Sequence, residues 1–327
     1  MNIVIDAFGG DNAPLEVIKG SLKAVKELNV DVTLVGDVDK IKACAKENNL
    51  DLNGLLYLQA DSVIDIHEEP TEILKSQKGC SMAVGLQALY EDKGNAFVSA
   101  GSTGALLAGA TFITKRIKGI KRAALAPLLP TSKGYMMLLD AGANTECKPQ
   151  MLEQFAVMGS AYMEKVLNIR KPKVGLLNIG SENTKGREME VEAYKLLENS
   201  SVNFMGNAEA RELPKGEFDV IVTDGFTGNI ALKLYEGMGS FFGHTLKHIL
   251  TSGLKSKLAA LMIMDGVKDF RKKMDYTEVG GAVLLGIEKP VIKAHGSSDA
   301  KAFFNAIRQA KNCIDGDIIG TIKNSLQ

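Results

Sequence analysis

The densest group of side chains that could hold an anion lies in residues 178–188. Asn178, Glu182, Lys185 and Arg187 all fall within this segment, which begins where an apolar run ends. Two cations beside backbone N–H groups are the donors that a bound phosphate requires. The Gly-x4-Gly-Lys-Ser/Thr pattern of nucleoside triphosphate loops is absent. We therefore favour a site for a simple phosphate group over the alternative of a solvated polar turn.

Two further segments combine glycines with small polar residues where an apolar run ends. The candidates for ligand contact are Asp6, Gly9, Gly10 and Asp11 in residues 6–14, and Ser102, Thr103 and Gly104 in residues 99–105. Backbone N–H groups at such turns can bind an anion, and the hydroxyl groups can add to them. Neither segment has the GxGxxG or GxSxG pattern, so a dinucleotide loop and a nucleophile elbow are not indicated. A plain helix cap is the alternative for each segment.

Three more segments place polar side chains at the end of an apolar run. They contain Asp140 and Asn144 in residues 138–144, Asp224, Gly225 and Asn229 in residues 223–230, and His295 in residues 294–299. Carboxamide and imidazole groups can donate to a developing oxyanion, and a histidine can also act as an acid or a base. Turns and helix caps are the alternatives for the Asp and Asn residues, and a structural role is the alternative for His295.

The motifs of the chain indicate neither a metal nor a cofactor. We find no His-Glu-x-x-His pattern, no paired Cys and His, and no dense carboxylate group that would hold a divalent ion. The four cysteines are widely spaced, which is typical of a protein of the reducing cytosol. We therefore expect chemistry that uses neither a metal nor a cofactor.

Short apolar runs position all of these segments. Nine runs are bounded by turn residues and mostly do not alternate, which is typical of strands buried on both faces. They are residues 3–6, 32–36, 55–59, 96–100, 136–140, 174–178, 202–205, 220–224 and 291–294. Helical stretches between them predict an α/β fold with a largely parallel sheet. Because ligands of such sheets bind at the carboxyl ends of the strands, we expect the polar segments to lie there.

The charge balance of the chain limits its partners. Lys+Arg and Asp+Glu each number 39 in the 327 residues, so the formal net charge is zero. A protein that binds nucleic acid over a broad face would be more basic, so we exclude that class. Residues 1–6 resemble a strand rather than a signal peptide, and no apolar run approaches the roughly 20 residues of a membrane span. We expect a cytoplasmic protein with at most peripheral membrane contact.

The order and spacing of the polar segments resemble the phosphate acyltransferase family (PlsX), the acyl carrier protein:phosphate transacylases. The resemblance is carried by residues 5–14, 68–70, 99–104, 140–144, 178–182, 185–186, 223–229 and 294–296, and it extends to about residue 310. Phe8 stands where the family usually has Met, an apolar exchange. The resemblance implies a three-layer fold similar to the isocitrate/isopropylmalate dehydrogenase and phosphotransacetylase group. It also implies a homodimer, loose association with the membrane, and acyl carrier protein and inorganic phosphate as partners at the start of phospholipid synthesis.

A thioester is already activated, so such an enzyme needs no covalent intermediate. It must hold phosphate near the thioester carbonyl and stabilise the oxyanion that develops there. We assign phosphate to Lys185 and to the N–H groups of Gly9, Gly10 and residues 102–104. Asn178, Asn229 and His295 are the candidates for the oxyanion. The remaining candidates for substrate binding are Asp6, Asp11, Asn144, Glu182, Asp224 and Gly225.

Residues 237–275 differ in character from the rest of the chain. Between Leu254 and Asp275, apolar residues recur at roughly helical spacing, and six cations accompany three acids, so 6 − 3 gives a net charge of +3. We predict two amphipathic helices, broken near residues 251–253, that form a hairpin inserted into a single catalytic domain of residues 1–327. Three contacts are open for the hairpin: a membrane surface, a partner subunit, or the acidic carrier protein.

Three other functions are weighed against this interpretation. A short-chain phosphotransacetylase would act on coenzyme A thioesters. A decarboxylating dehydrogenase of the same fold would need an arginine cluster and a metal-binding set of aspartates, neither of which we find. A non-catalytic fatty-acyl-binding protein would need an apolar pocket but no phosphate-binding segments.

Overall fold

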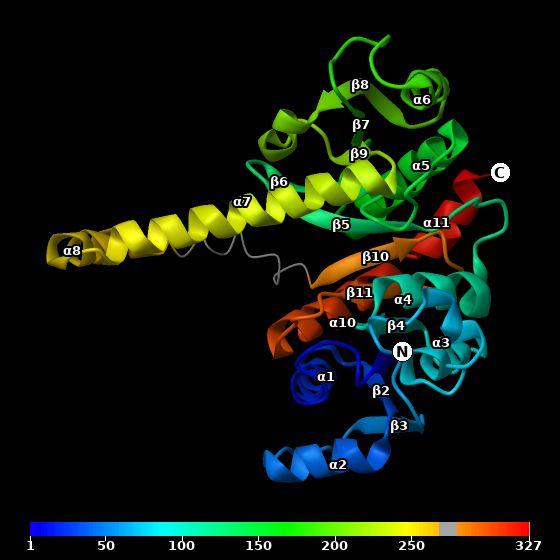
Figure 1. The fold of residues 1–327 in the computed structure, drawn as a ribbon, viewed down its shortest axis with the longest axis vertical. Helices are drawn as coiled ribbons and strands as arrows, with labels where there is room; N and C mark the ends of the chain where they lie inside the picture. Colours follow the sequence, from blue (N-terminus) through cyan, green and yellow to red (C-terminus); the bar gives the residue numbers. More distant parts are fainter. Residues whose placement is uncertain (268–279, 327) are drawn as a thin grey trace.

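Eleven strands form one twisted sheet in the computed structural model, which describes residues 1–267 and 280–326 (Figure 1). The strands lie in the order β3-β2-β1-β4-β11-β10-β5-β6-β9-β7-β8. Their bounds are β1 (Asn2–Asp6), β2 (Asp31–Gly36), β3 (Leu55–Gln59), β4 (Ala96–Ser99), β5 (Ala124–Thr131), β6 (Gly134–Leu139), β7 (Lys173–Asn178), β8 (Asn203–Glu209), β9 (Val220–Val222), β10 (Gly281–Leu285) and β11 (Val291–Ala294).

The sheet has two parallel halves joined by two antiparallel strands. Strands β3, β2, β1, β4 and β11 run parallel to one another, and so do β6, β9, β7 and β8. Between them, β10 is antiparallel to both β11 and β5, and β5 is antiparallel to β6. The predicted α/β fold with a largely parallel sheet is therefore confirmed, and each of the nine predicted runs coincides with a strand.

Helices cover both faces of the sheet, as the burial of its strands requires. The helices of the described residues are α1 (Leu15–Leu28), α2 (Val38–Glu47), α3 (Ser81–Tyr90), α4 (Thr103–Gly109), α5 (Pro149–Val166), α6 (Glu188–Glu198), α7 (Gly225–Thr251), α8 (Leu254–Met262), α10 (Ala300–Asp315) and α11 (Ile318–Ser325), with the shorter helical segments η1 (Pro70–Leu74), η2 (Ala110–Lys115) and η3 (Ala210–Lys215). The largest cluster of buried apolar residues lies under α1, α5 and α10, and a second one under α3 and α4. Every residue of β4, an interior strand of the sheet, is buried.

Helix α7 leaves the body of the protein and carries α8 at its far end (Figure 1). The two helices are separated at Ser252 and Gly253, within the predicted break at 251–253. The first helix is a single run from Gly225, so it starts twelve residues before the expected boundary at 237. The predicted continuation of the hairpin through residues 268–275 lies outside the described residues.

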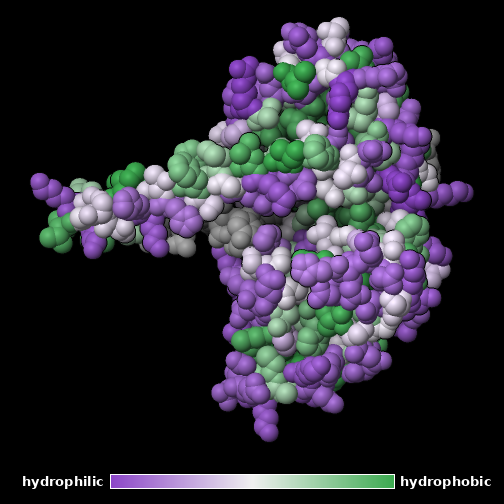
Figure 2. All heavy atoms as spheres, in the orientation of Figure 1, coloured by the Kyte–Doolittle hydropathy of each residue, from purple (hydrophilic) through white to green (hydrophobic). Residues whose placement is uncertain are grey.

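Apolar side chains remain exposed along this projecting arm, as Figure 2 shows. Those of α7 are Phe226, Ile230, Leu234, Met238, Phe241, Phe242 and Ile249, and those at its end are Leu254, Leu258, Leu261, Met262 and Ile263. Among the described residues, no helix combines the length and the apolar character needed to cross a membrane.

Candidate active site

A buried carboxylate organises the turn that follows β1. Asp6 is 1% exposed, and its two oxygens accept hydrogen bonds from the hydroxyls of Ser81 and Ser99, each at 2.7 Å. The backbone N–H groups of Phe8 and Gly9 also donate to this carboxylate. Burial raises the pKa of Asp6, and these hydrogen bonds act in the opposite direction. The carboxylate therefore holds the turn in place from inside the protein.

Three strand-end segments meet at this turn. A side chain at Gly9 would lie 2.7 Å from the backbone nitrogen of Gly101, so only glycine allows the β1 and β4 segments to approach so closely. The N–H of Asp11 donates to the carbonyl of Gly296 at 2.8 Å, and this contact joins the β1 and β11 segments. The carboxyl ends of β1, β4 and β11 therefore form one polar surface, as expected for a parallel sheet.

Lys293 lies in this region, and the sequence analysis missed it. It stands in β11, is mostly buried, and its ammonium group donates to the carbonyls of Ala100, at 3.3 Å, and Ala294. Burial lowers the pKa of Lys293 to about 8, although the carboxylates of Asp11 and Asp6 act to raise it. The sequence feature that could have identified Lys293 is a lysine inside an otherwise apolar strand. Lysines are rarely buried, and a buried lysine with a shifted pKa is often part of a functional site.

His295 and residues 102–104 lie at the edge of the same surface. His295 is exposed, and its Nδ1 lies 2.8 Å from the hydroxyl of Ser297. Ser102 caps α4, its hydroxyl accepting from the N–H of Ala105 at 3.4 Å. A side chain at Gly104 would lie 2.7 Å from Pro70, which explains the glycine by packing. These residues form the rim of the first cluster, with Asp6, Gly9, Gly10 and Asp11 at its centre.

A second buried carboxylate organises the turn that follows β6. Asp140 is fully buried and accepts hydrogen bonds from the N–H groups of Leu125, Gly142, Ala143 and Asn144 at 2.6–3.2 Å. The side-chain amide of Asn144 also donates to Asp140, and to the carbonyl of Ala123, each at 2.8 Å. Asn144 therefore fixes the turn, and burial raises the pKa of Asp140 against the effect of these donors.

The start of α7 is joined to this turn. The N–H of Gly225 donates to the carbonyl of Asn144 at 2.7 Å, and a side chain at Gly225 would lie 2.6 Å from that oxygen. Asp224 caps α7 through the N–H of Thr227, at 2.7 Å, and pairs with Arg187. Asn229, one turn further along α7, lies over Gly142. A Cβ atom placed on Gly142 would be 3.5 Å from the side-chain amide carbon of Asn229. The strand ends of β6 and β9 therefore share one surface.

Lys185 extends from the β7 segment into solvent. Its side chain is 48% exposed, and its ammonium group lies 3.9 Å from the carboxylate of Glu182. The amide of Asn178 donates to the carbonyl of Lys185 at 2.9 Å, so Asn178 sets the shape of this loop. Arg187 pairs with both Asp224 and Glu190, which ties the β7 loop to the start of α7 and raises the pKa of the guanidinium. Lys185 is thus the cation of this loop that is free to reach a ligand.

The structure therefore brings the predicted residues together in two clusters. The first, on the five-stranded half, holds Asp6, Gly9, Gly10, Asp11, Ser102, Thr103, Gly104 and His295. The second, on the four-stranded half, holds Asn144, Asn178, Glu182, Lys185, Asp224, Gly225 and Asn229. No group of three or more His, Cys, Asp or Glu side chains suited to a metal occurs in the described part of the chain. The donors of both clusters suit an anion.

Comparison with known proteins identifies the family. A sequence model of a family described as "Fatty acid synthesis protein" matches residues 1–320. A phosphate acyltransferase from Thermoanaerobacterium thermosaccharolyticum is 49% identical over 327 residues, which cover 100% of this chain and 97% of the relative. The chain belongs to the phosphate acyltransferase family. Phosphate acyltransferases from Thermoanaerobacter pseudethanolicus, at 50% identity, and from Clostridium botulinum, at 47%, each match 100% of this chain and 98% of their own length.

Solved structures show that the fold of the chain occurs in a wider group of proteins. A phosphotransacetylase from Streptococcus pyogenes has a TM-score of 0.64 at 16% identity. The superposition covers 95% of this chain and 94% of the phosphotransacetylase chain. A 4-hydroxythreonine-4-phosphate dehydrogenase from Klebsiella pneumoniae has a TM-score of 0.52 at 13% identity, with coverages of 96% and 99%. At these identities the likeness concerns the fold alone, and it agrees with the expected phosphotransacetylase and dehydrogenase group.

Proposed function

We propose that this phosphate acyltransferase moves a fatty acyl group from an acyl carrier protein thioester to inorganic phosphate, giving an acyl phosphate for phospholipid synthesis. The observation that carries the proposal is the full-length match to phosphate acyltransferases at close to 50% identity. Two clusters of anion donors at strand ends support it, since phosphate and the developing oxyanion each need such donors. Exposed apolar side chains beside the second cluster, Ile179 and Phe226, suit a fatty chain.

In the proposed reaction a phosphate oxygen attacks the thioester carbonyl, and the carbon–sulfur bond breaks as the new carbon–oxygen bond forms. The electron pair of the broken bond leaves with the carrier thiolate. Lys185, from the second cluster, and Lys293, from the first, are the two candidate cations that would bind phosphate and neutralise its charge. Asn178, Asn229 and His295 remain the candidates that donate to the oxyanion on the carbonyl.

The buried carboxylates have a different role in this proposal. Asp6 and Asp140 are enclosed by the protein, so they position the turns that present the donors and do not contact the ligand. The N–H of Gly9 donates to Asp6, so in this proposal it is not a donor to phosphate. The role of Gly9 is its small size, which allows the β1 and β4 segments to approach each other. Gly225 connects the start of α7 to the Asn144 turn, and Asp224 caps α7 and pairs with Arg187 of the β7 loop.

The test uses purified protein, a long-chain acyl carrier protein and inorganic phosphate. We expect carrier thiol release that depends on phosphate, and a product that hydroxylamine traps as a hydroxamate. Turnover only with short-chain coenzyme A thioesters would place the chain with the phosphotransacetylases. No turnover with either thioester would favour a non-catalytic acyl-binding protein.

We also propose that two copies of the chain associate through α7. Seven large apolar side chains of this helix are exposed along one side, while only Gly225 and Gly228 are buried. Soluble monomers rarely expose so long an apolar surface, and a second copy would cover it. Leu234→Glu should therefore convert a dimer to a monomer in light scattering, whereas a monomeric wild type would contradict the proposal.

We propose that the arm of residues 237–275 places its end on the cytoplasmic membrane surface. Leu254, Leu258 and Met262 of α8 are 83%, 64% and 88% exposed, and Lys255 and Lys257 stand between them. Apolar and cationic side chains together suit an anionic lipid surface. Leu258→Glu should abolish flotation with anionic vesicles while the dimer persists. Retained flotation would exclude the tip as the lipid contact.

A further inference from the structure

An unusually basic stretch of the chain runs from just before β4 to the end of β6. Residues 93–139 contain seven cations and no Asp or Glu, in a chain whose cations and acids are equal in number. Five of the cations are concentrated in residues 115–122, which join η2 to β5. We call residues 115–122 the basic loop; its cations are Lys115, Arg116, Lys118, Lys121 and Arg122.

The charge of the basic loop is not neutralised within the described part of the protein. Lys118, Lys121 and Arg122 are exposed. None of the five cations takes part in an ion pair among the described residues. The nearby acid Glu288, whose N–H donates to the carbonyl of Lys115, is paired with Lys323 instead. The loop therefore presents uncompensated positive charge to solvent.

The loop has a defined shape and an apolar anchor. The guanidinium of Arg116 donates to the carbonyls of Ile120 and Lys121, which closes the loop on itself. The ammonium group of Lys115 donates to the hydroxyl of Tyr90 at 2.9 Å. An open hollow of about 380 Å³ lies within the loop, and Phe112, 62% exposed, is at its rim. Cations around an exposed aromatic ring suit a protein partner, because interfaces are enriched in aromatic residues and Arg.

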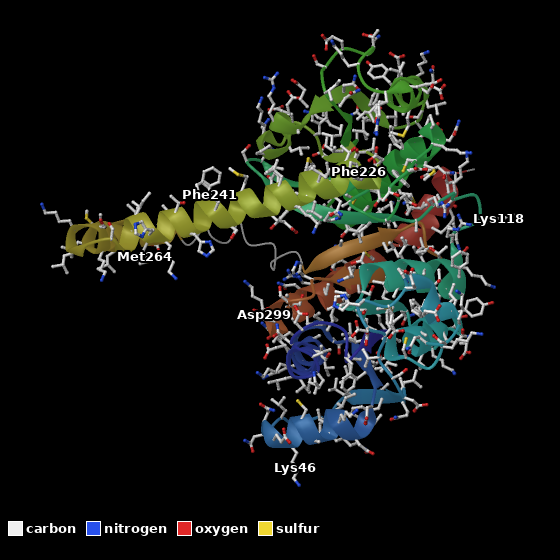
Figure 3. The ribbon with its side chains drawn as sticks, in the orientation of Figure 1. Lys46, Lys118, Phe226, Phe241, Met264 and Asp299 are labelled. Atoms are coloured by element: carbon white, nitrogen blue, oxygen red, sulfur yellow. The ribbon has the colours of Figure 1, made fainter. Side chains whose placement is uncertain are left out.

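The loop lies next to the second cluster of the site. Its last residue, Arg122, precedes Ala123, whose carbonyl accepts from Asn144. The N–H of Lys121 donates to the side-chain oxygen of Gln154 in α5, and the amide of Gln154 donates to the carbonyl of Gly119, each at 2.9 Å, so the loop is held against α5. Figure 3 shows Lys118 on the side of the body opposite Met264 at the end of the arm, with Phe226 between them.

We propose that the basic loop, with Phe112, is the surface on which an acidic carrier protein docks to deliver its acyl thioester. The proposal rests on the proposed function and names where its protein substrate binds. The cations of α8 are a poorer choice for this partner, because 27 helical residues separate them from the site, about 40 Å. A carrier bound beside Ala123 has only to bring its thioester to the adjacent turn.

The experiment compares two charge reversals of equal size in the full-length protein. Lys118→Glu/Lys121→Glu changes the loop, and Lys255→Glu/Lys257→Glu changes α8. Each protein is assayed with a long-chain acyl carrier protein and with an uncharged acyl-pantetheine thioester, at low and high salt. Binding of the carrier protein alone is measured in parallel, so the docking surface is tested even if wild-type protein shows no phosphate-dependent turnover.

We expect the loop variant to raise the KM for acyl carrier protein and its dissociation constant by about tenfold at low salt, with a smaller effect at high salt. Its kinetics with acyl-pantetheine, and both activities of the α8 variant, should remain those of wild type. Unchanged carrier binding would overturn the proposal, as would an equal loss with both thioesters. Loss of anionic vesicle binding with unchanged carrier binding would assign the loop to lipid instead. Absence of turnover in wild type would refute the proposed function separately.

Discussion

Replacing Lys293 with methionine should weaken phosphate binding while the fold is retained. Methionine keeps the length of the side chain and removes its charge and its donors. A charge-assisted hydrogen bond to phosphate is worth about 1.5–3 kcal/mol, so we expect the KM for phosphate to rise between about tenfold and 150-fold. The KM for the acyl thioester should change far less, because only the phosphate contact is lost.

The pH dependence of the same side chain gives a second measurement. Burial lowers the pKa of Lys293 to about 8, against the carboxylates of Asp6 and Asp11, so the ammonium group loses its proton as the pH rises through that value. Only the protonated form attracts phosphate. The KM for phosphate in wild type should therefore increase about tenfold per pH unit above pH 8, and the methionine variant should lack this increase.

The assay is phosphate-dependent release of the carrier thiol, followed from pH 7 to about 9.5, with the melting temperature of each variant measured alongside. A methionine variant that melts like wild type and has an unchanged KM for phosphate would remove Lys293 from the phosphate site. A variant with the same loss for both substrates would instead indicate that Lys293 only supports the strand-end segments.

Three further predictions concern the second cluster. Lys185→Ala should raise the KM for phosphate or lower kcat by about tenfold or more; unchanged kinetics in both would remove this residue from the site. Gly225→Ala should cost about 1–3 kcal/mol of unfolding free energy in denaturant titrations, because its new methyl group meets the Asn144 carbonyl at 2.6 Å. Gly243→Ala, where the space is open, should be neutral or stabilising, and equal effects of the two would refute the steric argument. Ile179→Ser should raise the KM for long acyl chains relative to short ones, and an equal change for all lengths would contradict an apolar contact there.

Much of the fold could be predicted from the sequence, because buried parallel strands are short apolar runs that end in polar residues. The two strands that were missed are the antiparallel ones. Strand β5 contains Pro127 and Pro130, which weaken a strand prediction, and β10 is a five-residue run beginning at Gly281. Their pairing with each other comes from parts of the chain far apart in sequence, which no local pattern reveals.

The site was predictable in its segments but not in the roles of its side chains. Asp6 and Asp140 were recognised as strand-end carboxylates, yet only the structure places their oxygens inward among hydrogen-bond donors. The pairing of Arg187 with Asp224 depends on the approach of β7 to β9 and was equally invisible. Lys293 was overlooked because an apolar run hides one charged residue within it.

The strand order also imposes a sequence of events on folding. Strand β4 can pair with β11 only after the second half of the chain and the projecting arm have been synthesised. The first half of the sheet therefore has an open edge until the last few dozen residues arrive, and Lys293 and His295 arrive with them. Closing so long a loop is slow, and an unpaired edge strand can bind other chains. A chain truncated before β10 would thus combine an incomplete site with a tendency to aggregate, and no partially active fragment of the first half is expected.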